Sequence, residues 1–142
     1  MVADPSGKSA VLEYVGEKDA TDTDPTKRQL KVQYNDPEIS KKGQIVTNFV
    51  LRKDYYDQAA DKKGLDRYTL LQTELAKKAY KLNDETEAMN LLGQVAGRNW
   101  PNDDENCITT HSVIYNLTKK TAFWVTNEHY QEPAYHYHFA FK

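Results

Sequence analysis

Two histidines near the carboxyl end, His136 and His138, have the spacing of a metal-binding pair. A strand places residues i and i+2 on one face, so both imidazoles would point the same way, and carboxylates could complete a metal shell. The alternate positions Tyr135, Tyr137 and Phe139 are aromatic, as expected of a core face. We therefore interpret the histidine face as outward and solvated, and we predict neither a metal nor a cofactor.

The other residues that could do chemistry do not form a catalytic pair in the sequence. Cys107 is the sole cysteine, and it stands between an acidic loop and an apolar segment, which favours a buried small hydrophobe over a nucleophile. His111 has no serine or cysteine neighbour for which it could act as base. A single cysteine also excludes an internal disulfide and a tetrathiolate metal site. Asn48, judged from the residues alone, is a turn former at a strand end.

The composition excludes several classes of function. The chain of 142 residues is 39% hydrophobic and 28% charged, which argues against a disordered or membrane-spanning protein. Nineteen Lys and Arg balance 21 Asp and Glu, and no basic stripe is present, so we predict no nucleic-acid partner. Apolar runs are only a few residues long, which predicts no membrane segment, no signal peptide and a cytoplasmic setting. Ten tyrosines indicate broad half-polar surfaces, such as strand faces or a cleft wall.

Residues 1–49 are predicted to be strands and turns. A Pro5-Ser6-Gly7-Lys8 turn precedes the first full strand, no capped start precedes Val2, and a strand there would need a partner. The sequence therefore begins as if cut from a longer chain. The predicted strands are Ser9–Val15, an alternating stretch through Leu30, Val32 and Tyr34, and a short apolar strand over Ile45–Phe49.

Residues 54–97 are predicted to be helical and residues 107–142 to be antiparallel strands. A second helix begins at Asp84, with Glu87 three residues later as in a capping box, and stops at Gly97. The first helix carries an apolar stripe of Tyr68, Leu71, Leu75, Ala79 and Leu82. The final strands are Ile108–Leu117, Thr121–Thr126 and Tyr135–Phe141. This order predicts a single α+β domain, with an antiparallel meander packed on a helical hairpin.

Four ordered segments, spread over nearly the whole chain, carry a family resemblance. They resemble the carboxyl-terminal half of the choloylglycine hydrolase and penicillin V acylase group, N-terminal-nucleophile (Ntn) amidases that cleave linear amide bonds. The segments are the hairpin Val2 to Tyr14, Val46-Thr47-Asn48-Phe49, Asp66-Arg67-Tyr68, and Thr110 to Leu117 followed by Thr121-Ala122-Phe123-Trp124.

The resemblance implies a fold, a site and a substrate class. The fold would be part of the αββα layered Ntn-hydrolase fold. Asn48 would serve the oxyanion hole, and Arg67 would reach the nucleophile, where an immobile cation favours a thiolate. The substrate would be a small N-acyl amide of the bile-salt, penicillin V or a related type, hydrolysed without a cofactor.

This chain departs from the family pattern at the nucleophile. The family nucleophile is a cysteine exposed as the first residue after processing, whereas residue 1 here is Met and Cys107 lies near the far end. We therefore expect the chain alone to be inactive and to self-associate, as a homo-oligomer, through unpaired edges or apolar faces. The alternative is a non-catalytic α+β module that binds a ligand or a protein in a tyrosine-rich cleft.

Overall fold

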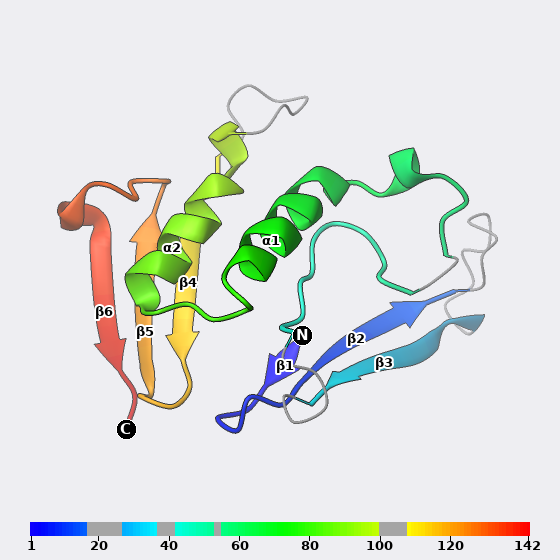
Figure 1. Cartoon of the computed structure of the whole chain (residues 1–142), viewed down its shortest axis with the longest axis horizontal. Coiled ribbons are helices and arrows are strands. Elements are labelled where there is room, and N and C mark those ends of the chain that lie inside the picture. Colours follow the sequence, from blue (N-terminus) through cyan, green and yellow to red (C-terminus); the bar gives the residue numbers. More distant parts are fainter. Residues whose placement is uncertain (17–26, 37–41, 53–54, 100–107) are drawn as a thin grey trace. The chain divides into compact units, whose positions relative to one another are not determined.

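The computed structural model describes residues 1–16, 27–36, 42–52, 55–99 and 108–142, and these residues form two compact units. The units are Met1–Thr73 and Glu74–Lys142. Figure 1 labels the helices and strands of both units. The described residues contain two three-stranded antiparallel sheets and two α-helices, which confirms the α+β prediction. Neither of these helices has the length and apolar character needed to cross a membrane.

The first unit contains a sheet of order β1-β2-β3, made of β1 (Val2–Ala3), β2 (Ser9–Val15) and β3 (Gln29–Asn35). The predicted turn joins β1 to β2. Gly7 N donates to Asp4 O at 3.0 Å, and Ser6 N donates to Asp4 Oδ1 at 2.8 Å. The φ of 86° at Gly7 lies in the left-handed region that glycine adopts without strain. Local turn chemistry therefore fixes this hairpin.

The two faces of this sheet differ in burial. The face shared by Leu12, Tyr14, Leu30 and Tyr34 is apolar, yet these side chains are between 45% and 82% exposed. The opposite face contains the buried Val11 and Val15, with Glu13 between them. A half-buried sheet normally buries its apolar face. Here one apolar face is left open.

Residues 42–52 cover part of the buried side, but the strand predicted over Ile45–Phe49 is wrong. Side chains anchor this segment in place of a strand ladder. Gln44 accepts a bond from the Ser9 hydroxyl at 2.8 Å and donates to the carbonyl of Gln33 at 2.8 Å. Leu51 N donates to Glu13 Oε1 at 2.5 Å. The apolar residues of Ile45–Phe49 belong to a segment that does contact the sheet. The sequence does not show that Gln44 and Leu51 make the hydrogen bonds.

Helix α1 (Leu65–Lys77) is shorter than the predicted apolar stripe. Ala79 and Tyr80 have left-handed φ values of 50° and 57°, which end the helix before either residue could extend it. Tyr80 N donates to Leu75 O at 2.7 Å, the closing bond of a Schellman motif. The stripe therefore stops one turn early, and Leu82 lies outside the helix.

Helix α2 (Glu85–Gln94) begins where the sequence predicts. The Asp84 carboxylate accepts from Glu87 N at 2.7 Å, and the Glu87 carboxylate accepts from Asn83 N at 2.6 Å. Glu87 also pairs with Lys78. The backbone bond from Asn83, followed by the bond from Lys78, holds the pKa of Glu87 below its ordinary value. The predicted capping-box start is confirmed.

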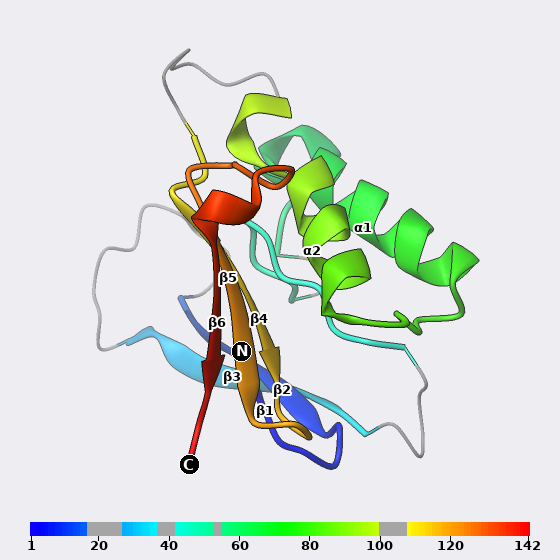
Figure 2. The same cartoon turned by 90° about the vertical axis from the view of Figure 1, so that its left-hand side faces the viewer.

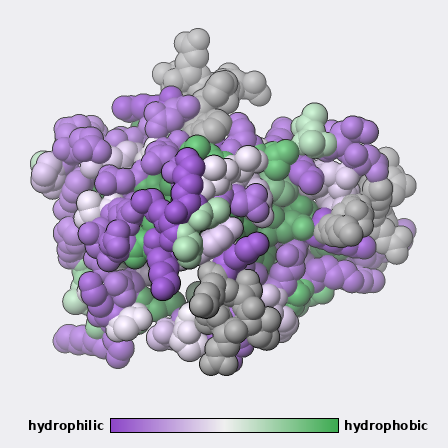
Figure 3. All heavy atoms as spheres, viewed as in Figure 1, coloured by the Kyte–Doolittle hydropathy of each residue, from purple (hydrophilic) through white to green (hydrophobic). Residues whose placement is uncertain are grey.

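The second unit contains a sheet of order β4-β5-β6, made of β4 (His111–Asn116), β5 (Thr121–Thr126) and β6 (His136–Ala140). Helix α2 lies on one face of this sheet (Figure 2). Met89 of the helix and Phe123 and Val125 of β5 form the buried cluster, each at most 4% exposed. The outer side of α2 is mostly hydrophilic (Figure 3).

The prediction that the aromatic residues of β6 form a core face is wrong, because Tyr137 and Phe139 are 43% and 47% exposed. His136 pairs with Val125 and His138 with Phe123, so both histidines lie on the side of the sheet on which α2 packs. His138 is nevertheless exposed, as predicted, and His136 is half-buried. The His138 ring stacks on Phe123 with centroids 4.5 Å apart and 8° between the planes. Strand alternation separates the two sets of side chains, but only packing decides on which side of the sheet the helix lies.

Candidate functional site

The two residues that the resemblance places in a site are in contact within the first unit. Arg67 Nη2 donates to Asn48 Oδ1 at 2.7 Å, across 19 residues of sequence. A guanidinium has donors only, so the amide oxygen of Asn48 must face it. The Nδ2 group then remains as the donor of the Asn48 side chain. The contact leaves Asn48 oriented to donate a hydrogen bond elsewhere, and its side chain is exposed.

The first turn of α1 provides this contact through consecutive residues. Arg67 meets Asn48, and the next residue, Tyr68, packs its ring against Phe49 with centroids 5.3 Å apart and 64° between the planes. Phe49 is only 9% exposed. A polar contact and an aromatic contact therefore join Asn48-Phe49 to Arg67-Tyr68, and the buried Phe49 ring helps to fix the position of the exposed Asn48 side chain.

Gly64, immediately before α1, makes room for the arginine. Its φ is +79°, and a Cβ built there would lie 2.9 Å from Arg67 Nη2 and 3.5 Å from Asn48 N. A larger residue would meet both a strained backbone and the guanidinium. The sequence analysis missed Gly64, although a glycine directly before a helix was the available signal.

The chain after Asn48 is held at several points. Val50 N donates to the hydroxyl of Tyr56 at 3.2 Å, and Lys62 Nζ lies 5.8 Å from the centre of the Phe49 ring. These residues surround a hollow of about 350 Å³, within the size range of small-molecule sites. Its lining residues are Phe49, Val50, Leu51, Arg52, Tyr55, Tyr56 and Lys62. Aromatic walls with cationic groups thus adjoin the segment that carries Asn48.

The remaining sequence candidates do not assemble into a site. Cys107 lies outside the described residues. His111 is exposed and meets only the edge of Trp124, at 6.3 Å between centroids, among the ring contacts described for it. His136 Nε2 lies 3.1 Å from the carbonyl of His129. In the described part of the chain, no three His, Cys, Asp or Glu side chains are grouped to hold a metal ion.

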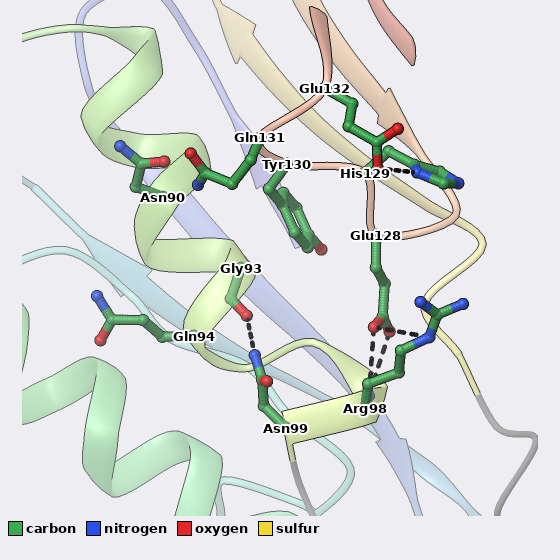
Figure 4. Close-up of a pocket in the computed structure, with 10 residues that line it drawn as sticks. All are labelled: Asn90, Gly93, Gln94, Arg98, Asn99, Glu128, His129, Tyr130, Gln131 and Glu132. Atoms are coloured by element: carbon green, nitrogen blue, oxygen red, sulfur yellow. Dashed lines mark hydrogen bonds and ion pairs between the residues drawn. The ribbon is translucent and has the colours of Figure 1, made fainter.

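A polar pocket of about 570 Å³ lies in the second unit (Figure 4). Its charged groups are engaged with one another. Glu128 accepts from Thr109 N at 2.5 Å and pairs with Arg98 Nε at 3.7 Å, while His129 Nδ1 lies 2.7 Å from Glu132. The Glu128 side chain is only 5% exposed. These contacts hold the turn after β5 against the end of α2, so we interpret the pocket as structural.

Tyr130 completes the same structural cluster. Its hydroxyl bonds the buried Ser112 at 2.8 Å, and a Cβ at Gly93 would lie 3.3 Å from its ring. A glycine inside α2 therefore lets the ring lie directly on the helix. Burial raises the pKa of the Tyr130 phenol. Tyr130 serves the packing of the second unit.

Comparisons of this chain with protein-family models, with curated proteins and with solved structures give no match. The contact between Asn48 and Arg67 is therefore the structural feature that bears most directly on the function of this chain.

Proposed function

We propose that this chain is the carboxyl-terminal portion of an N-terminal-cysteine amidase that hydrolyses a linear amide. The chain would supply Asn48 as the oxyanion donor and Arg67 as the cation of the site. The observation that supports this most is the 2.7 Å bond from Arg67 Nη2 to Asn48 Oδ1. Two residues named by the resemblance, 19 positions apart in the sequence, are thus in direct contact, and this contact supports the proposal.

The Asn48 amide is suited to stabilise a developing negative charge. The attack of a thiolate on an amide carbonyl places charge on the carbonyl oxygen, and a fixed N–H donor lowers the energy of that state. Arg67 holds the other end of the Asn48 amide, so the Nδ2 group need not reorient during the reaction. A preorganised donor is more effective than one that must turn toward the charge.

Arg67 would have a second role at the nucleophile. A cation near a thiol favours the thiolate and lowers its pKa, and the thiolate is the attacking species. The hollow beside Asn48, whose wall is more polar than apolar and includes Arg52 and Lys62, is large enough for part of a small N-acyl amide. No cofactor is needed for this chemistry.

The nucleophile would come from residues upstream of Met1, so the proposal has a direct test. We expect the 142-residue chain alone to hydrolyse no chromogenic N-acyl amide, because an oxyanion donor without a nucleophile has no intermediate to stabilise. Turnover should appear when the upstream reading frame, beginning Met-Cys, is included. A Cys107→Ala variant controls for the one thiol present. Robust turnover by the isolated chain that depends on Cys107 would refute the proposal.

The role of Arg67 can be tested in that longer protein. Replacing Arg67 by Leu removes a cation, so the pKa of the nucleophile should rise and the acid limb of the pH–rate profile should move to higher pH. The matched control is Arg98→Leu, which removes a cation from the second unit. An Arg67→Leu profile that coincides with the unsubstituted profile would remove Arg67 from the site.

One observation favours the alternative, a non-catalytic binding module. Tyr115 and Tyr137 are 63% and 43% exposed on one face of the second sheet, as a tyrosine-rich binding surface requires. The reading frame distinguishes the two functions. A binding module would have no Met-Cys start upstream, and Asn48 would be dispensable for its ligand.

A further inference from the structure

We propose that the exposed aromatic face of the β4-β5-β6 sheet is the surface through which two copies of this chain associate. The inference is argued from the exposure and shape of this face, and it names the surface for the self-association that the sequence predicts for the isolated chain. The aromatic face lies opposite the face that α2 covers. Its members are Val113, Tyr115, Ala122, Trp124, Tyr137 and Phe139, joined by Phe141, whose ring stacks on Tyr115 at 6.3 Å.

The exposed area of this face suits a dimer interface. Tyr115, Tyr137, Phe139 and Phe141 are 63%, 43%, 47% and 51% exposed. At roughly 200 Å² for each aromatic side chain, they present about 400 Å² per copy. Two copies would bury about 800 Å² of apolar surface. At the roughly 65% apolar fraction of homodimer interfaces, this corresponds to about 1,200 Å² in total, the lower limit for stable interfaces.

The shape of the face supports a partner with protruding rings. Ala122 is 5% exposed and forms the floor of a hollow of about 570 Å³. Aromatic walls rise around it, because Tyr115 stacks on Phe141 and Trp124 lies 6.2 Å from Phe139. The hollow therefore provides a place for a ring of the second copy, and a two-fold axis would repeat that contact in both directions.

The charge of the face also suits self-association. None of its members carries a formal charge, so stacking one copy on another brings no like charges together. The apolar groups supply the association energy, because their burial removes them from water. His111 of β4 also lines the hollow, and it is counted as neutral at pH 7. A second copy therefore meets a largely apolar surface without a formal charge.

The test is sedimentation equilibrium of the full chain over a hundredfold concentration range, with a matched pair of variants. Tyr115→Glu places two like charges in the stacked interface and should raise the dimer dissociation constant at least tenfold. Tyr34→Glu is the control, because Tyr34 is 82% exposed on the apolar face of the first sheet. It should leave the dissociation constant unchanged. Circular dichroism checks that both variants fold.

A second measurement leaves the aromatic face unaltered. In a Trp100→Phe background, Trp124 is the sole tryptophan, and its emission should shift to longer wavelength on dilution, in step with dissociation. A concentration-independent species of 16.4 kDa would overturn the proposal. It would also be overturned if Tyr34→Glu dissociated the dimer and Tyr115→Glu did not. Binding of a small apolar molecule by a monomer at all concentrations would identify the face as a ligand site instead.

Discussion

The two sheets of this protein have the same number of strands and the same sequential order, but different interactions cover them. In the first unit, Glu13 and Gln44 tie an extended segment to the sheet through hydrogen bonds. In the second unit, Met89 of α2 packs on Phe123 and Val125 with no polar atom in the cluster. The contacts described for the first sheet are mainly directional, whereas the second sheet combines an apolar cluster with the hydrogen bonds of Glu85.

This difference bears on where a site can be built. Hydrogen bonds depend on distance and angle, so they fix the position of the segment that contains Asn48. Apolar burial is roughly proportional to area and has little direction, so the cluster around Met89 contributes mainly to the stability of the second unit. We therefore expect substitutions in that cluster to act on stability, and substitutions at Asn48 to act on the proposed function. The following predictions test that contrast.

The largest effect is expected in the apolar cluster of the second unit. Met89→Ala leaves a cavity under β5 and should lower the free energy of unfolding of that unit by about 2–5 kcal/mol. Urea unfolding followed by Trp124 emission, in a Trp100→Phe background, measures this effect. Leu12→Ala in the first unit is the control, since Leu12 is 45% exposed, and its effect should be much smaller. Equal losses would contradict the contrast between the units.

A second prediction concerns the site of the first unit. Under the proposed amidase function, Asn48→Ala in the upstream-extended protein should lower kcat about a hundredfold with a smaller change in KM, as for other oxyanion donors. The melting temperature should change little, because the Asn48 side chain is exposed. Asn90→Ala, an exposed amide on α2, should leave kcat unchanged. A hundredfold loss caused only by unfolding would appear in the melting curve.

A smaller effect is expected at Gly64. Gly64→Ala introduces a methyl group 2.9 Å from Arg67 Nη2 at a residue with φ +79°, so it should displace the arginine and lower kcat of the extended enzyme by about tenfold. Stability should fall by about 1 kcal/mol. Gly43→Ala is the matched control, because nothing lies within 4 Å of its built Cβ. If both variants behaved alike, the close approach at Gly64 would not matter.

The smallest effect is expected at Glu85, which connects α2 to the second sheet. Its carboxylate accepts from Asn116 Nδ2 at 2.9 Å and from Thr121 Oγ1 at 3.0 Å, and these bonds, Asn116 first, hold its pKa below the ordinary value of 4.5. A lowered pKa contributes stability above pH 4.5 that is lost as the pH falls through the folded-state pKa.

Glu85→Gln should therefore lower the melting temperature at pH 7, and the difference from the unsubstituted chain should close in acid. Melting temperatures measured between neutral and acidic pH test this. Glu132→Gln removes the same charge from an exposed pair with His129 and should have a smaller effect. A difference that grew as the pH fell would contradict the assignment.

Local signals in the sequence predicted several elements well. The cap at Asp84 and the strand Thr121–Thr126 are confirmed, because a capping residue and a β-branched apolar run act through near neighbours. The strand over Ile45–Phe49 and the length of α1 were wrong, because they depend on contacts with Gln44 and on the left-handed turn at Tyr80. The Gln44 bonds join residues that are distant in the sequence, and the left-handed turn at Tyr80 has no glycine to signal it.

By itself, the sequence determined the α+β class, the alternation of β6 into a histidine set and an aromatic set, and the residue types at Asn48 and Arg67. The tertiary structure alone decided that α2 packs on the side of the sheet that carries Phe123 and the histidine set, and that Arg67 meets Asn48 across 19 residues. The alternation of side chains along a strand and the capping of a helix are set by residues close together in the sequence. The covered face and the distance between distant side chains follow from the packing of whole elements, which no local pattern encodes.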